Sequence, residues 1–581
     1  MTQAPARPGT TRGINSYRPV ISARRHVVSA GHYLAAHAGF LVLEAGGNAV
    51  DAGVAAGIAL GVLQSDIVNV AGVAPIILYH AESRQVFTVS GLGVWPRLVT
   101  PDYFATRHGG KIPRGLLRTV VPAAPDAWIQ ALQRWGTMSF GDVAAESVRF
   151  AREGFAAHPL LCETIATHRK GYEEWASNAA IYLPHGRPPQ PGELFVQSDL
   201  ADSLQYMIDQ ERAAAGKGRH VGLEAARAAF YTGDLARTIV AYHEQNGGLL
   251  RMADLAEFRS GIEPSVAVPF GDFAVHTCGP WCQGPVLAQM LRLVEATGCH
   301  RHPHNSFAYV HALTEVMKLA FADRHAYYGD PRFIDVPLER LLSAEYAARR
   351  ARLVRSDEAW PDMPPPGLER SGMAHASGPL AAYPQPQLDT SYVCAVDRHG
   401  NVFSATPSDV SSSTPVIPGT GLCPSSRGSQ SWGDAGLAAS VAPGKRPRLT
   451  PSPALALGPD GRAIPFGTPG GDAQAQAMLQ TFLNRVVFGM DPQAAVEAPR
   501  FATYSFPDSF EPHSSQPGRL VLEGRLSQAL ADQLAGVGHD VQWWPDWTWK
   551  AGAVCMIDSD PRAGLHHAAA DPRRSTYALG W

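Results

Sequence analysis

Two apolar runs near the start of the chain are separated by a short glycine and asparagine segment. In LAAHAGFLVLEAGGNAVDAGVAAGIALGVL, Gly46-Gly47-Asn48 divides them. This pattern predicts a helix, a Gly/Asn cap and a second, buried helix. The segments IILYH and VFTVS follow with AESRQ between them, and they predict a β-hairpin.

From about residue 122 to residue 343 the pattern is mainly helical. One helix is predicted directly after Asn305-Ser306, where apolar residues recur at helical spacing: Phe307, Val310, Leu313, Val316, Met317, Ala320 and Phe321. Gly329-Asp330-Pro331 ends it, because glycine and proline do not continue a helix.

The composition changes abruptly between Trp360 and Leu388. Residues 361–388 are rich in proline and lack a regular period, which predicts a linker. The next residues, Thr390 to Val396, have strand composition, and residues 397–401 (DRHGN) have turn chemistry. Residues 402–406 return as a strand, so the linker runs directly into a β-hairpin that begins with a threonine.

Length and charge limit the classes of function. A chain of 581 residues exceeds one ordinary core, so we expect one large domain or two intimately packed ones. A net charge of −3 offers no general attraction to nucleic acid or to anionic membranes, which favours small-molecule substrates. The opening segment lacks the apolar run of a secretory signal, and the apolar stretch 50–63 is too short to cross a bilayer, so we expect a cytoplasmic protein.

Neither a disulfide framework nor a metal site is indicated. The chain has seven scattered cysteines, and CGPWC at 278–282 has three residues between its sulfurs where redox motifs have two, so we expect buried thiols. HExxH, paired CxxC and EF-hand patterns are missing from the sequence, and His566-His567 is expected in an exposed turn. We therefore predict no metal and no cofactor.

The linker–strand junction carries a possible chemistry. An N-terminal threonine can use its own α-amine, with a pKa of about 7.7–8.0, as the base that activates its hydroxyl. A cut before Thr390 would create such a residue, since a linker precedes it and a strand follows. The pattern alone also fits an ordinary strand threonine.

Five segments occur in the order and spacing of one known family. They are LEAGGNAVDAGVAAGIAL, AFADRHAYYGDPRF, DTSYVCAVDRHGN, KRPRLTPSP and FGTPGGDAQ. From about residue 26 to the C-terminus the chain resembles the γ-glutamyltransferase family of N-terminal-nucleophile (Ntn) hydrolases. The resemblance implies an α+β fold, a four-layer αββα sandwich, made as a proenzyme that cleaves itself between Asp389 and Thr390.

The resemblance also implies chain boundaries and site residues. After an N-terminal tail (1–25), residues 26–389 would form the large chain and 390–581 the small chain, with two copies of each. The nucleophile falls on Thr390 and its supporting hydroxyl on Ser408. The oxyanion-hole glycines fall on Gly470 and Gly471, because glycine lets backbone N–H groups approach a developing oxyanion.

Departures from the family pattern concentrate on recognition of the glutamyl group. The family's carboxylate-binding arginine aligns near Leu92, and its glycine-rich loop is replaced by VNVAGVAP at 68–75. Further substrate-binding positions fall on Arg427, Gln430, Val410, Leu449 and Thr450. Arg427 could bind a substrate carboxylate, pair with an internal one or be a solvated loop charge, and Arg97 could replace the lost arginine.

Three hypotheses follow. The first is a self-processing threonine amidase for a small carboxylate-bearing amide, similar to the oxamate amidohydrolase branch. The second is a γ-glutamyl hydrolase or transpeptidase. The third is an unprocessed binding protein in which Thr390 is only a strand residue. All three predict the same fold.

Overall fold

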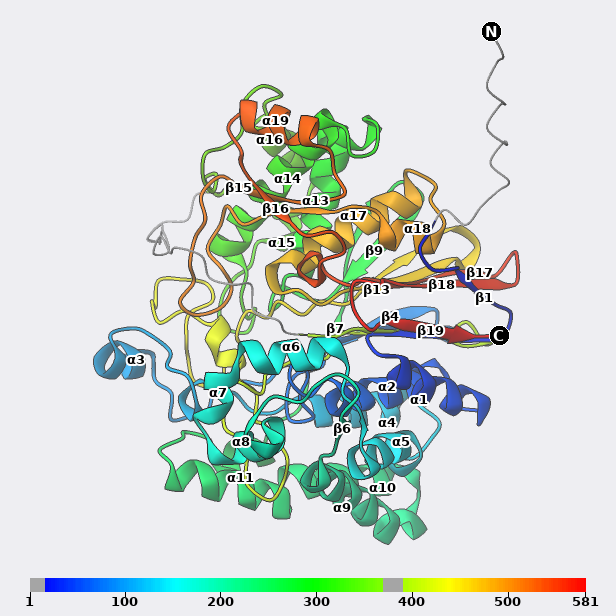
Figure 1. Cartoon of the computed structure of the whole chain (residues 1–581), viewed down its shortest axis with the longest axis vertical. Helices are drawn as coiled ribbons and strands as arrows, with labels where there is room; N and C mark the ends of the chain where they lie inside the picture. The colour runs from blue at the N-terminus through cyan, green and yellow to red at the C-terminus, as the bar shows by residue number, and fades with distance from the viewer. Residues whose placement is uncertain (1–15, 369–389) are drawn as a thin grey trace.

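Two stacked sheets form the centre of the molecule. The computed structural model describes residues 16–368 and 390–581. Each of the two sheets has seven strands. Figure 1 shows them lying one above the other, with helices covering the outer face of each. This is the four-layer αββα sandwich of an Ntn hydrolase, as the resemblance implies.

The first sheet is antiparallel throughout and combines strands from distant parts of the chain. Its order is β1 (Ile21–Ala23), β18 (Leu565–Ala570), β17 (Cys555–Asp560), β13 (Ala463–Gly467), β12 (Ala454–Leu457), β9 (Phe273–Thr277) and β8 (Val266–Phe270). Part of the predicted N-terminal tail therefore forms an edge strand. Residues 1–15 of that tail lie outside the described residues.

The second sheet is also antiparallel. Its order is β19 (Tyr577–Gly580), β2 (Val27–Ala30), β10 (Val393–Val396), β11 (Val402–Ala405), β3 (Ile76–His80), β4 (Gln85–Val89) and β7 (Ile262–Pro264). Strand β2 lies between β10 and β19, which both follow residue 390. The two predicted chains thus share one sheet.

Strand β10 shows why this part of the sequence is almost continuously apolar. Val393 and Ala395 belong to the core beneath the helices, whereas Cys394 and Val396 belong to the core between the two sheets. Successive strand residues point to opposite faces, and both faces of this strand are covered.

Helices α1 (Tyr33–Glu44) and α2 (Ala49–Leu63) confirm the predicted helix, cap and helix. The Asn48 side chain accepts from backbone N–H groups of the first turn of α2, and Asp51 completes the capping box. All 15 residues of α2 are buried. A Cβ on Gly53 would lie 2.0 Å from the Phe403 ring, so glycine permits close packing of α2 on β11.

The first sheet is covered by α13 (Gly284–Thr297), α17 (Gln474–Val486) and α18 (Pro492–Glu497), and α14 (Phe307–Tyr327) packs on α13 (Figure 1). Helix α14 is the helix predicted after Asn305-Ser306, and the Ser306 hydroxyl caps it. Further helices in the predicted helical region include α4 (Ala124–Trp135), α5 (Phe140–Glu153), α6 (Pro159–Thr167), α9 (Ser198–Ala214), α10 (Arg219–Tyr231), α11 (Asp234–Gln245) and α16 (Ala344–Ala351).

Three local expectations differ from the structure. Strands β7, β8 and β9 interrupt the region predicted as mainly helical. His566 and His567 lie in strand β18 and are only partly exposed, so the exposed turn is wrong. The β10 ladder begins at Val393 and not at Thr390, because the backbone of Thr390 has a left-handed φ of 81°.

Two sequence expectations concern sulfur and membranes. Cys278 and Cys282 are buried free thiols between β9 and α13, as expected. Among the described residues, no helix combines the length and apolar character that a bilayer crossing demands. Most of the predicted linker, residues 369–388, lies outside the described residues.

Candidate active site

Thr390 lies three residues before the start of β10 and is completely buried. Its backbone N–H donates to Ile67 O at 3.0 Å, from the loop that follows α2. The same carbonyl accepts from Asp409 N at 3.1 Å. Thr390 and Asp409 have φ values of 81° and 148°, which are unusual for residues with a Cβ, and such backbone strain clusters at functional sites.

Ser408 supports the Thr390 hydroxyl. The two side-chain oxygens are 2.6 Å apart, and Gln474 Nε2 lies 3.5 Å from Thr390 Oγ1. Backbone bonds in both directions with Val73 fix Ser408. Arg427 Nη2 donates a hydrogen bond to Ser408 Oγ. Because Ser408 Oγ is the acceptor in that bond, its own proton can be donated to Thr390 Oγ1.

Gly470 and Gly471 form the turn between β13 and α17. Their φ values of 125° and 55° fall where residues with a Cβ are disfavoured. Neither backbone N–H donates to another residue in the described ranges 16–368 and 390–581. Two adjacent free N–H groups are what an oxyanion hole requires.

A buried ion pair anchors this glycine turn. Asp472 accepts from Arg324 of α14 and, at 2.8 Å, from Ser509 N. Gln283 Nε2 donates to Gly471 O at 2.9 Å, and Arg324 also contacts Gln283. The AFADR and TPGGD segments, which are distant in sequence, therefore meet at one place.

Arg427 makes internal contacts. Its side chain is 1% exposed, its Nε lies 3.8 Å from Asp409 Oδ2, and its guanidinium lies over the Phe510 ring. Asp409 in turn accepts from the hydroxyls of Ser425 and Ser426. Arg427 thus acts on Ser408 and is no solvated loop charge.

The remaining predicted substrate-binding residues occupy different places. Gln430 Nε2 donates to Thr450 Oγ1 at 2.8 Å, and both side chains are buried. Arg97 is 60% exposed, pairs with Glu257 and contacts neither Thr390 nor Ser408. Leu92 is buried in the core between the sheets. Asp389 lies outside the described residues.

Two groups near Thr390 carried no strong sequence signal. Arg574 Nη1 donates to Thr390 O at 3.3 Å. Asp66, next to Ile67, is completely buried, and neither carboxyl oxygen makes a hydrogen bond of ordinary geometry within the described part of the chain. Burial raises the pKa of Asp66 to about 7, although nearby N–H groups, Thr164 and Arg574 act to lower it.

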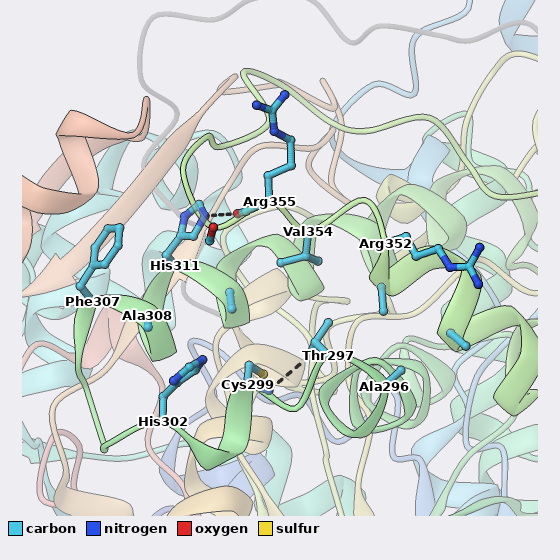
Figure 2. Close-up of a pocket in the computed structure, with 14 residues that line it drawn as sticks. Ala296, Thr297, Cys299, His302, Phe307, Ala308, His311, Arg352, Val354 and Arg355 are labelled. Carbon is cyan, nitrogen blue, oxygen red and sulfur yellow. Dashed lines mark hydrogen bonds between the residues drawn. The ribbon is translucent and has the colours of Figure 1, made fainter.

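A separate cavity lies between α13, α14 and α16. It has a volume of about 400 Å³, and Figure 2 shows His311 at its wall with a hydrogen bond to the Arg355 carbonyl. His311, Glu315 and His539 are close enough to share a metal ion. However, His311 and His539 bond to each other at 2.9 Å, and Glu315 pairs with Lys318 at 2.8 Å, so these groups already have partners.

The fold and the site together define a class. The site combines a buried threonine just ahead of a central strand, a serine hydroxyl beside it and two glycine N–H groups without a partner in the described residues. In an αββα sandwich, these are the parts of an Ntn-type amide hydrolase. The chain belongs to the γ-glutamyltranspeptidase family, whose model matches residues 35–581. It is therefore an amide hydrolase of that family.

Curated relatives cover most of the chain. It is 32% identical to the acylase ACY 1 proenzyme of Pseudomonas sp. (strain SE83), over 90% of this chain and 88% of the relative. It is 30% identical to the glutathione hydrolase-like YwrD proenzyme of Bacillus subtilis (strain 168), over 92% and 94%. The oxamate amidohydrolase proenzyme of Klebsiella pneumoniae is 25% identical over 92% and 94%.

Solved structures agree with the fold over nearly the full length. LmbA2991HD has a TM-score of 0.90 and 37% identity, covering 97% of this chain and 100% of its own. The cephalosporin acylase of Bacillus halodurans has a TM-score of 0.83 and 26% identity, covering 100% and 99%.

Proposed function

We propose that this chain is a self-processing amidohydrolase that cuts itself between Asp389 and Thr390 and then forms an acyl-enzyme on Thr390. The observation that carries the proposal is the 2.6 Å contact between Thr390 Oγ1 and Ser408 Oγ at a buried, strained residue. Proenzyme names among the relatives support the production of a large and a small chain from one precursor.

The mechanism uses the new α-amine as the base. The amine takes the hydroxyl proton, Thr390 Oγ1 attacks the amide carbonyl, and Gly470 and Gly471 N–H groups hold the resulting oxyanion. Collapse breaks the C–N bond, and the protonated α-amine gives its proton to the leaving amine. Water then attacks the ester by the same route and releases the acid.

The proposed substrate is a small amide that carries a carboxylate and is not a standard γ-glutamyl compound. Leu92 is buried and cannot pair with a carboxylate, and Gln430 is hydrogen-bonded to Thr450. The residues at the family's glutamyl-binding positions therefore differ from those of the family pattern. An acylase and an oxamate amidohydrolase among the relatives support this direction. A cytoplasmic location and two copies of each chain stay predictions.

Intact mass and activity test the proposal together. Purified enzyme should contain fragments 1–389 and 390–581, and Thr390→Ala should remain a single chain without amidase activity. Thr390→Ser is the matched variant, because it keeps the hydroxyl and should retain processing. Active wild-type enzyme that is still one chain would contradict the proposal, whereas a single chain without amidase activity would favour the unprocessed binding protein.

The γ-glutamyl alternative has its own readout. A chromogenic γ-glutamyl anilide should be a poor substrate beside anilides of simple dicarboxylic acids. Rapid, Thr390-dependent release from the γ-glutamyl compound would favour a glutathione-type enzyme. If Arg97 served as its carboxylate anchor, Arg97→Gln would abolish that release, whereas the exposed ion pair with Glu257 predicts no change.

A further inference from the structure

Within the described part of the chain, Arg448 is a buried arginine that forms no ion pair with a carboxylate. Its side chain is 1% exposed, and its Nη1 donates to the backbone oxygen of Arg324 at 3.0 Å. Its Nε and Nη2 have no hydrogen-bond partner within residues 16–368 and 390–581. Burial of a guanidinium with unpaired N–H groups destabilises the folded protein unless an anion binds to it.

The surroundings of Arg448 connect it to the catalytic residues. Its charge interacts with Asp472, which directly follows the oxyanion-hole residue Gly471, and with Arg324, which anchors that turn. Asp472 already forms an ion pair with Arg324. The positive charge of Arg448 is therefore not neutralised within this group of three residues.

The extended backbone around Leu449 places Arg448 beside a predicted substrate-binding position. Leu449 N donates to Trp281 O, and Leu449 forms a bridge with Cys282, so this segment is extended. In an extended segment, residues two apart share a face. Arg448 therefore shares a face with Thr450, which is bonded to Gln430.

An aromatic pair adjoins the same charge. Arg448 interacts electrostatically with His513, whose ring stacks on Trp432 with centroids 3.7 Å apart. Burial lowers the pKa of His513 to about 4, so this ring is neutral near pH 7 and does not compete for an anion.

We propose that Arg448 binds the substrate carboxylate in the acyl group and replaces the anchor that Leu92 cannot provide, so the enzyme takes monoamides of dicarboxylic or keto acids. The inference rests on the proposed function and deepens it. Arg448 fits this role better than Arg427, which acts on Ser408, or Arg97, which is exposed and paired with Glu257. A guanidinium with free N–H groups on two nitrogens can hold a carboxylate in bidentate fashion.

Arg448 remains charged under assay conditions. Burial and the like charge of Arg324 lower the pKa of Arg448 to about 9, whereas Asp472 acts to raise it. Near pH 7 the cation therefore predominates, and the opposite charge of a bound carboxylate would stabilise it further.

The test compares matched anilides on processed enzyme. The p-nitroanilides of oxalic, succinic and glutaric acid carry a free carboxylate, and those of acetic and butyric acid do not. Wild type should prefer at least one carboxylate-bearing anilide. Arg448→Gln should lower its kcat/KM roughly 10- to 100-fold, mostly through KM, and change the neutral anilides less than about threefold, as loss of a charged hydrogen bond predicts. Arg448→Lys should keep part of the preference, and Arg301→Gln, an exposed arginine, should keep all of it.

Equal losses on charged and neutral anilides, or no loss on either, would overturn the proposal. If Arg448→Gln does not fold, Arg448→Lys and the wild type still test the proposal. A wild-type enzyme that shows no preference for carboxylate-bearing anilides would also overturn the proposal. Failure of the proposed function looks different: wild type would hydrolyse none of the anilides above the Thr390→Ala blank and would remain a single chain.

Discussion

At the scale of single residues, we predict that the Thr390–Ser408 contact controls the reactivity of Thr390, the proposed nucleophile. Ser408→Ala removes the hydroxyl 2.6 Å from Thr390 Oγ1 and leaves Arg427 without this acceptor. We expect kcat to fall about 100-fold or more, because preorganised hydrogen bonds at the reacting oxygen are worth about 3 kcal/mol. Stopped assays with an anilide substrate measure this change in kcat. Ser83→Ala is the control, because Ser83 lies in an exposed turn. Unchanged kcat in Ser408→Ala would remove Ser408 from the mechanism.

Asp66 predicts a pH dependence of stability. Its pKa rises from 3.8 in the unfolded chain to about 7 in the folded protein, because burial penalises the carboxylate. Between these values the folded state holds a proton that the unfolded state has lost. The free energy of unfolding should therefore fall as pH rises, by up to about 1.4 kcal/mol per pH unit, and level off above pH 7.

Asp66→Asn isolates this contribution. The uncharged variant lacks the decline, so its stability relative to wild type should increase from about pH 4 to pH 7. Thermal unfolding midpoints in the unprocessed Thr390→Ala background, across that range, check it. A difference between the two proteins that does not vary with pH would show that Asp66 has an ordinary pKa.

At the scale of elements, the turn between β13 and α17 depends on α14. Asp472→Asn breaks the buried pair with Arg324 and should loosen the turn that presents Gly470 and Gly471. We expect a loss of stability of about 3–5 kcal/mol and a roughly 10- to 100-fold fall in kcat per folded enzyme.

Asp558→Asn is the matched control for this effect. Asp558 is equally buried and pairs with Arg462 and Arg485, but it lies on β17 near the opposite end of β13. It should lose similar stability and keep kcat per folded enzyme. Equal falls in kcat for both variants would mean that the Asp472 effect is general destabilisation.

Local patterns were enough to predict several elements. Helices α1 and α2 are apolar runs separated by a Gly/Asn cap, and α14 combines apolar residues at helical spacing with a serine cap. Each of the three helices forms where the sequence predicts it. Strands β7 to β9 were not recognised, because short strands inside a long helical region lack a distinctive period. The start of β10 was misplaced, because the φ of Thr390 is set by a bond to Ile67, over three hundred residues away.

The residues of the candidate site also fall into two groups, those that the sequence predicted and those that it did not. The family resemblance predicted that Ser408 supports Thr390 and that Gly470 and Gly471 belong to the same site. The sequence did not predict separate roles for Arg324, Asp472 and Arg448, because the role of a buried charged residue depends on the groups that it contacts. Their partners come from distant segments, so only the folded chain shows which charge is satisfied and which is not.

At the scale of the whole molecule, the two predicted chains are interleaved. Strand β2 of the large chain pairs with β10 on one side and β19 on the other, and β11 pairs with β3. In the first sheet, β12 pairs with β9 and β18 with β1. These five ladders and the apolar core between the sheets join residues on both sides of position 390.

Cleavage before Thr390 should therefore leave the molecule intact. We expect fragments 1–389 and 390–581 to appear as two bands on a denaturing gel and to elute together in gel filtration without denaturant. Residues 390–581 expressed alone should be insoluble or unfolded by circular dichroism, because β10 and β11 would lose β2 and β3 and expose unpaired edges. Co-expression of the two fragments is the control, since it restores every ladder, and it should recover soluble protein. A folded, dispersed small chain on its own would show that the interleaved strands are not what holds the halves together.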